Sequence, residues 1–134
     1  MKKYLILLLC LITLSCSLDD DAPVFHSAFI PIDSVVIPEE FELNTTYKIS
    51  LKYTKPTNCH RFNDIYYAKN NNERTVAIVN SVLQNSDCTT LDTELEKSFN
   101  FRATKLGSYV FKFWQGRDES GEDIYIIEEV PVIE

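Results

Sequence analysis

From residue 30 onward, apolar and polar residues alternate in short segments that end at Pro, Asn or Gly. Residues 47–54 are the clearest example, because Tyr and aliphatic residues occupy every second position between Lys, Ser and Thr. A period of two is typical of a strand with one buried face, as in antiparallel sheets. No segment after the N-terminal run has the sustained period of an amphipathic helix. Seven strands are therefore predicted, at residues 33–43, 47–54, 59–69, 73–83 and 95–104, from 106 through the aromatic run to 114, and at 123–132.

Proline and asparagine indicate how these strands end or turn. Pro38 interrupts the first strand, which favours an edge position or a strand that switches sheets. The run of three asparagines at 70–72 predicts a tight turn between the third and fourth strands, since Asn tolerates left-handed backbone conformations. In the sixth strand the alternation turns Tyr109, Phe111 and Phe113 toward the core and leaves Trp114 on the opposite face.

The N-terminus has a different pattern. Lysines at positions 2 and 3 precede an apolar run at 4–14 that is polar only at Thr13, followed by Ser15 and Cys16. This run is too short to span a bilayer and has the charge pattern of a secretory signal. With a cysteine after the small residue, the segment resembles a bacterial lipoprotein signal. The resemblance implies cleavage before Cys16, a diacylglyceryl group on its sulfur and acylation of its amine, and two or more acyl chains hold a protein firmly to a membrane.

The residues after the cysteine extend this resemblance. Residues 17–21 read Ser-Leu-Asp-Asp-Asp and look like the acidic patch of surface-exposed lipoproteins in the Bacteroidetes group, although a solvated linker is an equal alternative. We therefore expect a signal peptide at 1–15, a lipidated cysteine and acidic linker at 16–28, and a β domain at 29–134. The expected location is the bacterial cell envelope, as an outer-membrane lipoprotein with the lipid as the contact to the membrane, and exposure at the cell surface is one of the two alternatives for the acidic patch.

The charge balance limits the class of partner. The 134-residue chain has 13 basic and 20 acidic residues, a net charge of -7, and removal of Lys2 and Lys3 with the signal makes the mature chain more acidic. Nucleic-acid binding needs a basic surface, so nucleic acid is excluded as a partner.

Cysteine usage agrees with export. Of the four cysteines, Cys10 lies in the signal and Cys16 is the expected anchor, which leaves Cys59 and Cys88. In an oxidising compartment the pair predicts a disulfide, worth about 3.5 kcal/mol in the chain-entropy model. A hairpin centred near residue 71 puts residue 59 opposite about residue 83, so the bridge would hold the base of the third and fourth strands. The alternative, a Cys59 nucleophile activated by His60, is disfavoured because neighbours on a strand point to opposite faces.

The start of the sixth strand resembles a known motif. Gly107 followed two residues later by Tyr109 resembles the tyrosine corner of immunoglobulin-like sandwiches, in which the hydroxyl bonds to upstream backbone. Phe111 stands where an antibody domain has its second cysteine, so the inter-sheet disulfide of those domains is not expected. The resemblance implies an all-β, seven-stranded, antiparallel immunoglobulin-like sandwich that follows a signal peptide and a short linker.

Few residues have the pattern of a reactive site. His26 and His60 are the two histidines and belong to no metal-binding motif, and the sequence has no Gly-rich phosphate loop or Gly-x-Ser-x-Gly elbow. We therefore expect neither an enzyme nor a metal or cofactor. The acidic stretch 117–123 suggests calcium as an alternative, but its carboxylates lack the spacing of a known calcium loop, so a solvated turn is preferred.

Exposed aromatic residues are the better candidates for binding. Trp114 is expected to face outward beside Arg117, and the pair Tyr66 and Tyr67 adds further aromatic surface. Aromatic rings with a polar rim are what glycan or protein partners contact. The competing interpretation, which the sequence favours because large aromatic residues are mostly buried, is that residues 30–38 cover Trp114 and make it a second small core.

Together these features predict a lipid-anchored, non-catalytic envelope protein that acts as a recognition or accessory module for a protein or glycan not specified by the sequence. Two alternatives remain, a structural envelope component without a ligand and a protease inhibitor that presents loops from a similar sandwich. The second rests on analogy of fold alone.

Overall fold

The computed structural model describes residues 22–84 and 86–134. The predicted signal, Cys16 and the linker as far as residue 21 lie outside the described residues. Within these two ranges the chain is all-β, and no helix is long and apolar enough to cross a membrane. Its nine strands are β1 (Phe25–Ile30), β2 (Ser34–Val36), β3 (Phe41–Glu42), β4 (Thr46–Thr57), β5 (His60–Asn70), β6 (Glu73–Leu83), β7 (Thr90–Arg102), β8 (Gly107–Arg117) and β9 (Asp123–Ile133).

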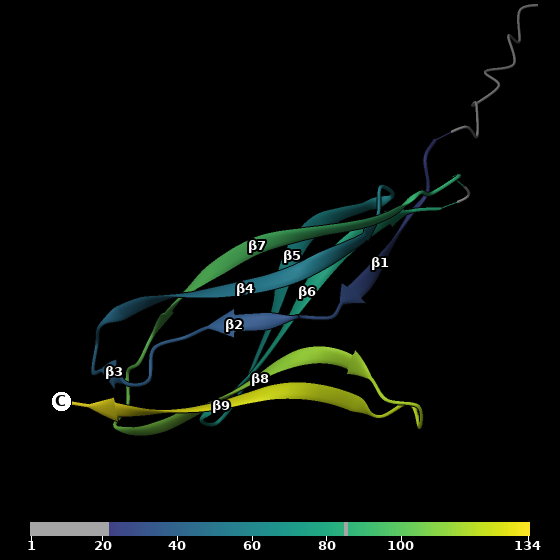
Figure 1. Cartoon of the computed structure of the whole chain (residues 1–134). Coiled ribbons are helices and arrows are strands. Elements are labelled where there is room, and N and C mark those ends of the chain that lie inside the picture. Colours follow the sequence, from purple (N-terminus) through teal and green to yellow (C-terminus); the bar gives the residue numbers. More distant parts are fainter. Residues whose placement is uncertain (1–21, 85) are drawn as a thin grey trace, which may run out of the picture.

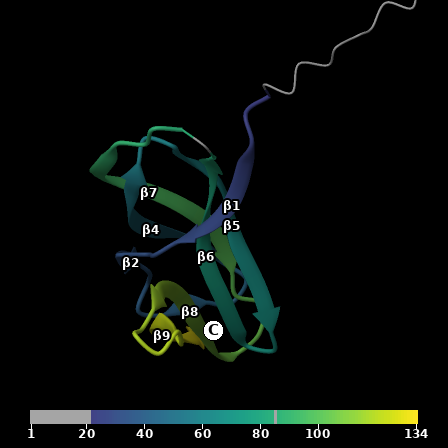
Figure 2. The ribbon, with the colours of Figure 1, turned by 90° about the vertical axis from the view of Figure 1, so that its right-hand side faces the viewer.

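The strands form two sheets that enclose the core. The larger sheet has six strands in the order β1-β6-β8-β9-β3, with β5 on the other edge of β6, and the smaller has the order β2-β4-β7. Figure 1 shows β4 and β7 above β8 and β9, and the view from the end in Figure 2 places β2, β4 and β7 on the side opposite β5 and β6. The N-terminal strand enters at one end of the molecule and the C-terminus lies at the other (Figure 1).

The prediction of seven strands is wrong, because the described chain has nine. The predicted strand at 33–43 divides into β2, which pairs with β4, and β3, which pairs with β9 in the other sheet. Pro38 lies between the two pieces and has no N–H to donate, so the strand stops there and crosses between sheets. This division adds one strand to the predicted seven, and β1 adds the other. β1 begins at Phe25, inside the segment predicted as linker, and pairs with β6.

The prediction of an entirely antiparallel sandwich is also wrong. Residues 73–76 of β6 pair with 110–113 of β8 in the same direction, and β3 pairs with β9 in parallel. The physical reason is the path of the chain, because β7 lies between β6 and β8 in sequence but in the opposite sheet. After one passage through that sheet, β8 returns in the direction of β6. Alternation along a strand reports which face is buried and carries no information on the direction of its neighbour.

The predicted inward faces are confirmed. Alternate residues of β4, β6 and β8 point between the sheets and are buried, and in β7 Phe101 is buried and Phe99 half-buried. Val110, Lys112 and Trp114 lie on the opposite face of β8. The buried cluster comprises Ile30, Ile32, Phe41, Ile49, Leu51, Tyr53, Val76, Ile78, Phe101, Ala103, Tyr109, Phe111, Phe113, Val130 and Val132.

Aromatic rings join the two sheets at the centre of this cluster. Phe101 of β7 lies with its ring centroid 5.0 Å from those of both Phe41 and Phe111, which belong to the larger sheet. Its ring also meets Tyr109 edge to face at 4.9 Å. Such tilted and edge-on contacts are favourable geometries for aromatic pairs.

The expected bond of a tyrosine corner is present at Tyr109. Its hydroxyl accepts a hydrogen bond of 3.2 Å from the backbone N–H of Thr104. Burial raises the pKa of Tyr109, but hydrogen bonding from Thr104 and the nearby Arg74 guanidinium outweigh burial, so this pKa lies below its ordinary value. The hydroxyl of Tyr47 accepts an equivalent bond of 3.0 Å from the N–H of Glu42, also five residues upstream. Two turns of the sandwich are therefore fixed in the same way.

The predicted disulfide is confirmed. Cys59 and Cys88 are bridged, with their Cα atoms 5.6 Å apart. The N–H of Leu83 donates to the carbonyl of Cys59, so residue 59 lies opposite residue 83 as the hairpin predicted. Asn71 has the left-handed conformation expected of the turn, with φ of 53°. The bridge thus ties the start of β5 to the segment that leads from β6 to β7. Because Cys59 is in a disulfide, the alternative of a Cys59 nucleophile is wrong.

Replacing both cysteines by serine is expected to lower the free energy of unfolding by about 3 kcal/mol, because the unfolded chain regains the freedom of a long loop. Denaturant unfolding followed by circular dichroism measures this change. Reduction of the unaltered protein should give a similar loss, and a double variant as stable as the oxidised protein would contradict the prediction.

Candidate functional site

Three aromatic side chains from three strands meet on the outer face of the larger sheet. The ring centroid of Phe29 in β1 lies 5.5 Å from that of Tyr66 in β5 and 5.7 Å from that of Trp114 in β8. Phe29 and Tyr66 are exposed, with 48% and 45% of their surface accessible, and Trp114 is half-buried. Together with Tyr125 of β9, these residues form what we call the outer aromatic surface.

The outer aromatic surface surrounds a hollow of about 270 Å³. Its floor is β6, where Thr75 and Ala77 present small side chains between the larger rings. Ala77 is paired directly with Tyr66, so the smallest side chain lies beside one of the tallest. The hollow therefore results from a difference in side-chain size along one row of the sheet, and its depth does not depend on a flexible loop.

A charged pair lies at the rim of this hollow. One carboxylate oxygen of Asp123 accepts a hydrogen bond of 3.0 Å from the indole Nε1 of Trp114 and another of 3.0 Å from Nε of Arg117. These bonds lower the pKa of Asp123 below its ordinary value, the Trp114 bond having the larger effect. A β-bulge between Trp114 and Gly116 permits the arrangement, and Gly116 is suited to it because its φ of 111° is strained for residues with a side chain.

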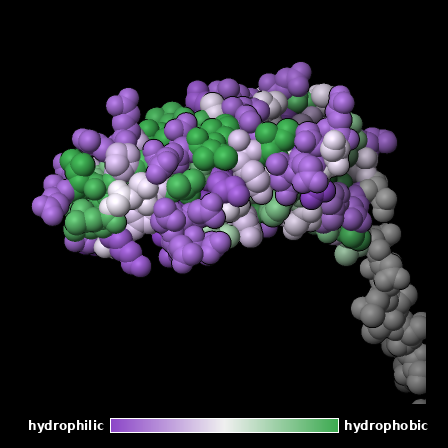
Figure 3. Space-filling view, turned by 90° about the horizontal axis from the view of Figure 1, so that it is seen from below, coloured by the Kyte–Doolittle hydropathy of each residue, from purple (hydrophilic) through white to green (hydrophobic). Residues whose placement is uncertain are grey.

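Apolar side chains on the neighbouring part of the surface are dispersed. Figure 3 views the molecule from below Figure 1 and shows apolar groups separated by polar ones. On β9, Ile127 is exposed and lies opposite Lys112 of β8. Lys112 in turn places its Nζ 4.7 Å from the ring centroid of Tyr125. The outer aromatic surface thus has the basic Lys112 beyond Tyr125 and the ion pair of Arg117 with Asp123 beside Trp114.

The structure brings together three of the four residues predicted for a ligand surface. Trp114, Tyr66 and Arg117 all line the hollow, and the outward orientation of Trp114 is as expected. Residues 30–38 do not bury it fully, although the N–H of Ile32 donates to its carbonyl and Phe29 packs on its ring. Tyr67 does not belong to this surface, because it follows Tyr66 on a strand and points to the opposite face.

Sequence reasoning missed Phe29, Tyr125 and Asp123 at this surface. A signal for Phe29 is present in the sequence, because Phe25 and Phe29 are four residues apart and would lie on the same face of a strand. Asp123 was recognised only as part of an acidic hairpin, because nothing in the sequence indicates that a bulge aligns it with Trp114.

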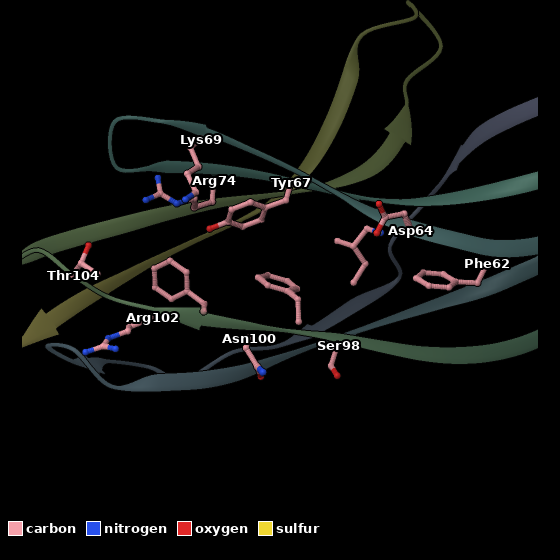
Figure 4. Close-up of a pocket in the computed structure, with 12 residues that line it drawn as sticks. Phe62, Asp64, Tyr67, Lys69, Arg74, Ser98, Asn100, Arg102 and Thr104 are labelled. Carbon is pink, nitrogen blue, oxygen red and sulfur yellow. The ribbon is translucent and has the colours of Figure 1, made fainter.

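Tyr67 lies instead in a second depression, between the two sheets (Figure 4). We call this depression of about 680 Å³ the inter-sheet groove. Burial raises the pKa of Tyr67, while the nearby Arg74 guanidinium opposes the rise. The residues that line the groove are Phe62, Asp64, Ile65, Tyr67, Lys69, Arg74, Ser98, Phe99, Asn100, Phe101, Arg102 and Thr104.

The remaining titratable candidates form no metal cluster within residues 22–84 and 86–134. His26 and His60 lie on opposite sides of Val82, and the Nδ1 of His60 is 2.8 Å from the hydroxyl of Thr57. Burial lowers the pKa of His60, and the charge of His26 adds to the effect. In the acidic hairpin, Asp118 accepts hydrogen bonds from the N–H groups of Ser120 and Glu122, so this carboxylate organises the turn.

Comparison of the chain with protein-family models, with curated proteins and with solved structures found no match.

The fluorescence of Trp114, the single tryptophan, should report the ionisation of Asp123. Because the folded pKa of Asp123 is below its ordinary value of 3.8, its bonds persist at neutral pH and are lost only as the pH falls through that lower value. An acid titration of the folded protein should therefore show a fluorescence change with a midpoint below 3.8. Asp123→Asn should remove this step. A midpoint above the ordinary value, or the same step in the variant, would contradict the assignment.

Proposed function

We propose that this protein is a lipid-anchored, non-catalytic recognition module of the bacterial envelope that binds a glycan or protein through the outer aromatic surface. The single observation that carries the proposal is the hollow walled by Phe29, Tyr66, Trp114 and Tyr125 on the face of the larger sheet. Exposed aromatic residues cost solubility, so a group of them around a concave surface favours a binding role.

The chemistry of the outer aromatic surface suits a ligand with apolar faces and polar edges. Flat rings offer contact area at a low cost in side-chain entropy, because each has two rotatable bonds. The pairing of Asp123 with both Trp114 and Arg117 fixes these groups before a ligand arrives. A preorganised surface loses less entropy on binding. Sugar rings have such alternating faces and edges, as do aromatic and Arg-rich protein segments.

The non-catalytic role is proposed from the sequence, which has no motif of a nucleophile with its base. The hollow agrees with this role, since Asp123 is its carboxylate and is engaged by two donors. Both donors bind the same oxygen of Asp123 and lower its pKa, and a carboxylate with a lowered pKa is a weak general base.

We also propose that the domain is related in architecture to immunoglobulin-like sandwiches. The bond between Tyr109 and Thr104 supports this relation, as does the passage of consecutive segments between two packed sheets. The parallel pairing of β6 with β8 is a difference from antiparallel immunoglobulin sheets.

Lipid attachment at Cys16 is proposed on the signal pattern, and the short spacing between Cys16 and the start of β1 at Phe25 is consistent with a domain held close to a membrane. Replacing Cys16 by serine should move the protein from the membrane fraction to the soluble fraction and abolish incorporation of an alkynyl fatty acid. Cys88→Ser is the matched control and should still incorporate the label. Equal labelling of the Cys16 variant would contradict the proposal.

Trp114→Ala should reduce cross-linking to the cellular partner by about tenfold, because truncating an aromatic anchor at the centre of an interface costs about 1.4 kcal/mol of binding free energy. Cross-linking in intact cells followed by mass spectrometry measures the loss, and a glycan array tests the sugar class directly. The matched control is Val36→Ala, an exposed apolar residue of the other sheet.

Thermal unfolding of both variants separates binding from stability. Retained stability with lost binding supports the recognition role. A Trp114 variant that loses more than about 3 kcal/mol of stability would mark the residue as part of a core, and a protein without any specific cross-link would favour a structural component.

A further inference from the structure

The inter-sheet groove runs along a free strand edge. Five consecutive residues of β7, 98–102, line it. Because neighbours on a strand point to opposite faces, a continuous run can line a groove only along the strand's edge. Within the described chain, β7 pairs with β4 alone, so its other edge has backbone N–H and C=O groups without a neighbouring strand. Such an edge is a template for another strand.

The floor of the groove is apolar. The rings of Tyr67 in β5 and Phe99 in β7 meet across the sheets with centroids 5.7 Å apart, and Phe62 and Ile65 continue this surface along β5. At one end, Nζ of Lys97 lies 4.5 Å from the ring centroid of Phe62. An extended chain along β7 would turn every second side chain toward these rings.

The other end of the groove is basic. Arg74 is 9% exposed, yet its Nε has no hydrogen-bond partner and the residue forms no salt bridge among residues 22–84 and 86–134. Its Nη1 donates to the carbonyls of Asn71 and Glu73. Figure 4 shows Arg74 beside Lys69 and the Tyr67 hydroxyl, with Arg102 across the groove. Buried charges are normally paired with an opposite charge, so a buried guanidinium without a carboxylate partner indicates a place for an anion.

The charge of the groove is opposite to that of the protein. The chain has a net charge of -7, but the groove is lined by three basic residues, Lys69, Arg74 and Arg102, and one acidic residue, Asp64. This local reversal favours an anionic occupant, since complementary potentials speed association and select partners.

We propose that the inter-sheet groove binds an extended acidic peptide segment of a partner protein, which adds as a strand to the free edge of β7 and places a carboxylate at Arg74. The five lining residues of β7 correspond to about 17 Å of strand, room for a segment of about five or six residues. Backbone hydrogen bonds to β7 supply affinity, and alternate apolar side chains on Tyr67 and Phe99 supply specificity. This site is separate from the outer aromatic surface, because Tyr66 and Tyr67 point to opposite faces of β5.

A phage-displayed library of random octapeptides, selected on the full-length protein in detergent, tests the proposal. Enriched sequences should alternate apolar residues and carry Asp or Glu near one end. A synthetic enriched peptide should shift the backbone amide resonances of residues 98–102, and its Asn or Gln analogue should bind about tenfold more weakly. Absence of enrichment, or enrichment without acidic residues, would overturn the proposal.

Protein variants separate the groove from other sites. Arg74→Gln should weaken the acidic peptide about tenfold and leave its neutral analogue unchanged. Because Arg74 is buried, the exposed pair Lys69→Glu and Arg102→Glu provides a second variant that should give the same loss in a folded protein. Trp114→Ala is the matched control and should retain full peptide binding. Equal loss in the Trp114 variant would place the peptide on the outer aromatic surface and overturn the proposal.

N-methylation of the peptide tests strand addition itself. Two peptides methylated at alternate backbone nitrogens, one at odd and one at even positions, should differ by about tenfold or more, since only one set of N–H groups faces β7. Equal affinities would mean that side chains alone are bound. An oligogalacturonate that competes with the peptide at Arg74 and also binds more tightly would identify an acidic glycan as the occupant and overturn the peptide proposal.

Discussion

The packing of Phe101 between the two sheets is the interaction on which the rest of the molecule depends. The smaller sheet has three strands and reaches the larger one through side chains of β4 and β7. Phe101 contributes most visibly, since its ring meets Phe41, Tyr109 and Phe111. Without these contacts the six-stranded and the three-stranded sheet would each expose one apolar face to water, which is unfavourable. The hydrogen bonds of Tyr47 and Tyr109 and the disulfide then fix the ends of the strands, whereas packing in the core determines which face of each strand is buried.

This constraint also explains why the molecule offers two unlike surfaces. The sheets are held firmly where Phe101 packs. On the side of β5 and β7 no strand of residues 22–84 and 86–134 joins them, so the edge of β7 and Arg74 border an open groove. The outer aromatic surface has a different origin. It depends on a single sheet, in which β6 carries small side chains between the larger rings of β1, β5 and β8. One surface therefore arises from how two sheets meet, and the other from side-chain size within one.

The two surfaces differ as well in how their charges are satisfied. Beside the outer aromatic surface, Arg117 and Trp114 already share the carboxylate of Asp123, so a ligand meets groups with fixed positions. In the groove, Arg74 is held by two backbone carbonyls and by the ring of Tyr109, 5.0 Å from its guanidinium carbon, and has no carboxylate partner in the described structure. Fixed pairs favour selection by shape, whereas an unpaired buried cation favours selection by charge.

The sequence by itself determined the strand character of the chain, the inward faces of β4, β7 and β8, the left-handed turn at Asn71 and the pairing of Cys59 with Cys88. The strand character and inward faces follow from local alternation, the turn from the chemistry of asparagine, and the disulfide from the even number of cysteines that remain after the signal and the anchor are assigned. Tertiary structure alone decided the strand β1, which of the two options at Pro38 holds, and the parallel contact of β6 with β8. It also decided that Phe29 and Asp123 join Trp114, and that Arg74 is buried at the end of a groove. The reason is physical, because alternation fixes which face of a strand is buried but not which strand lies beside it.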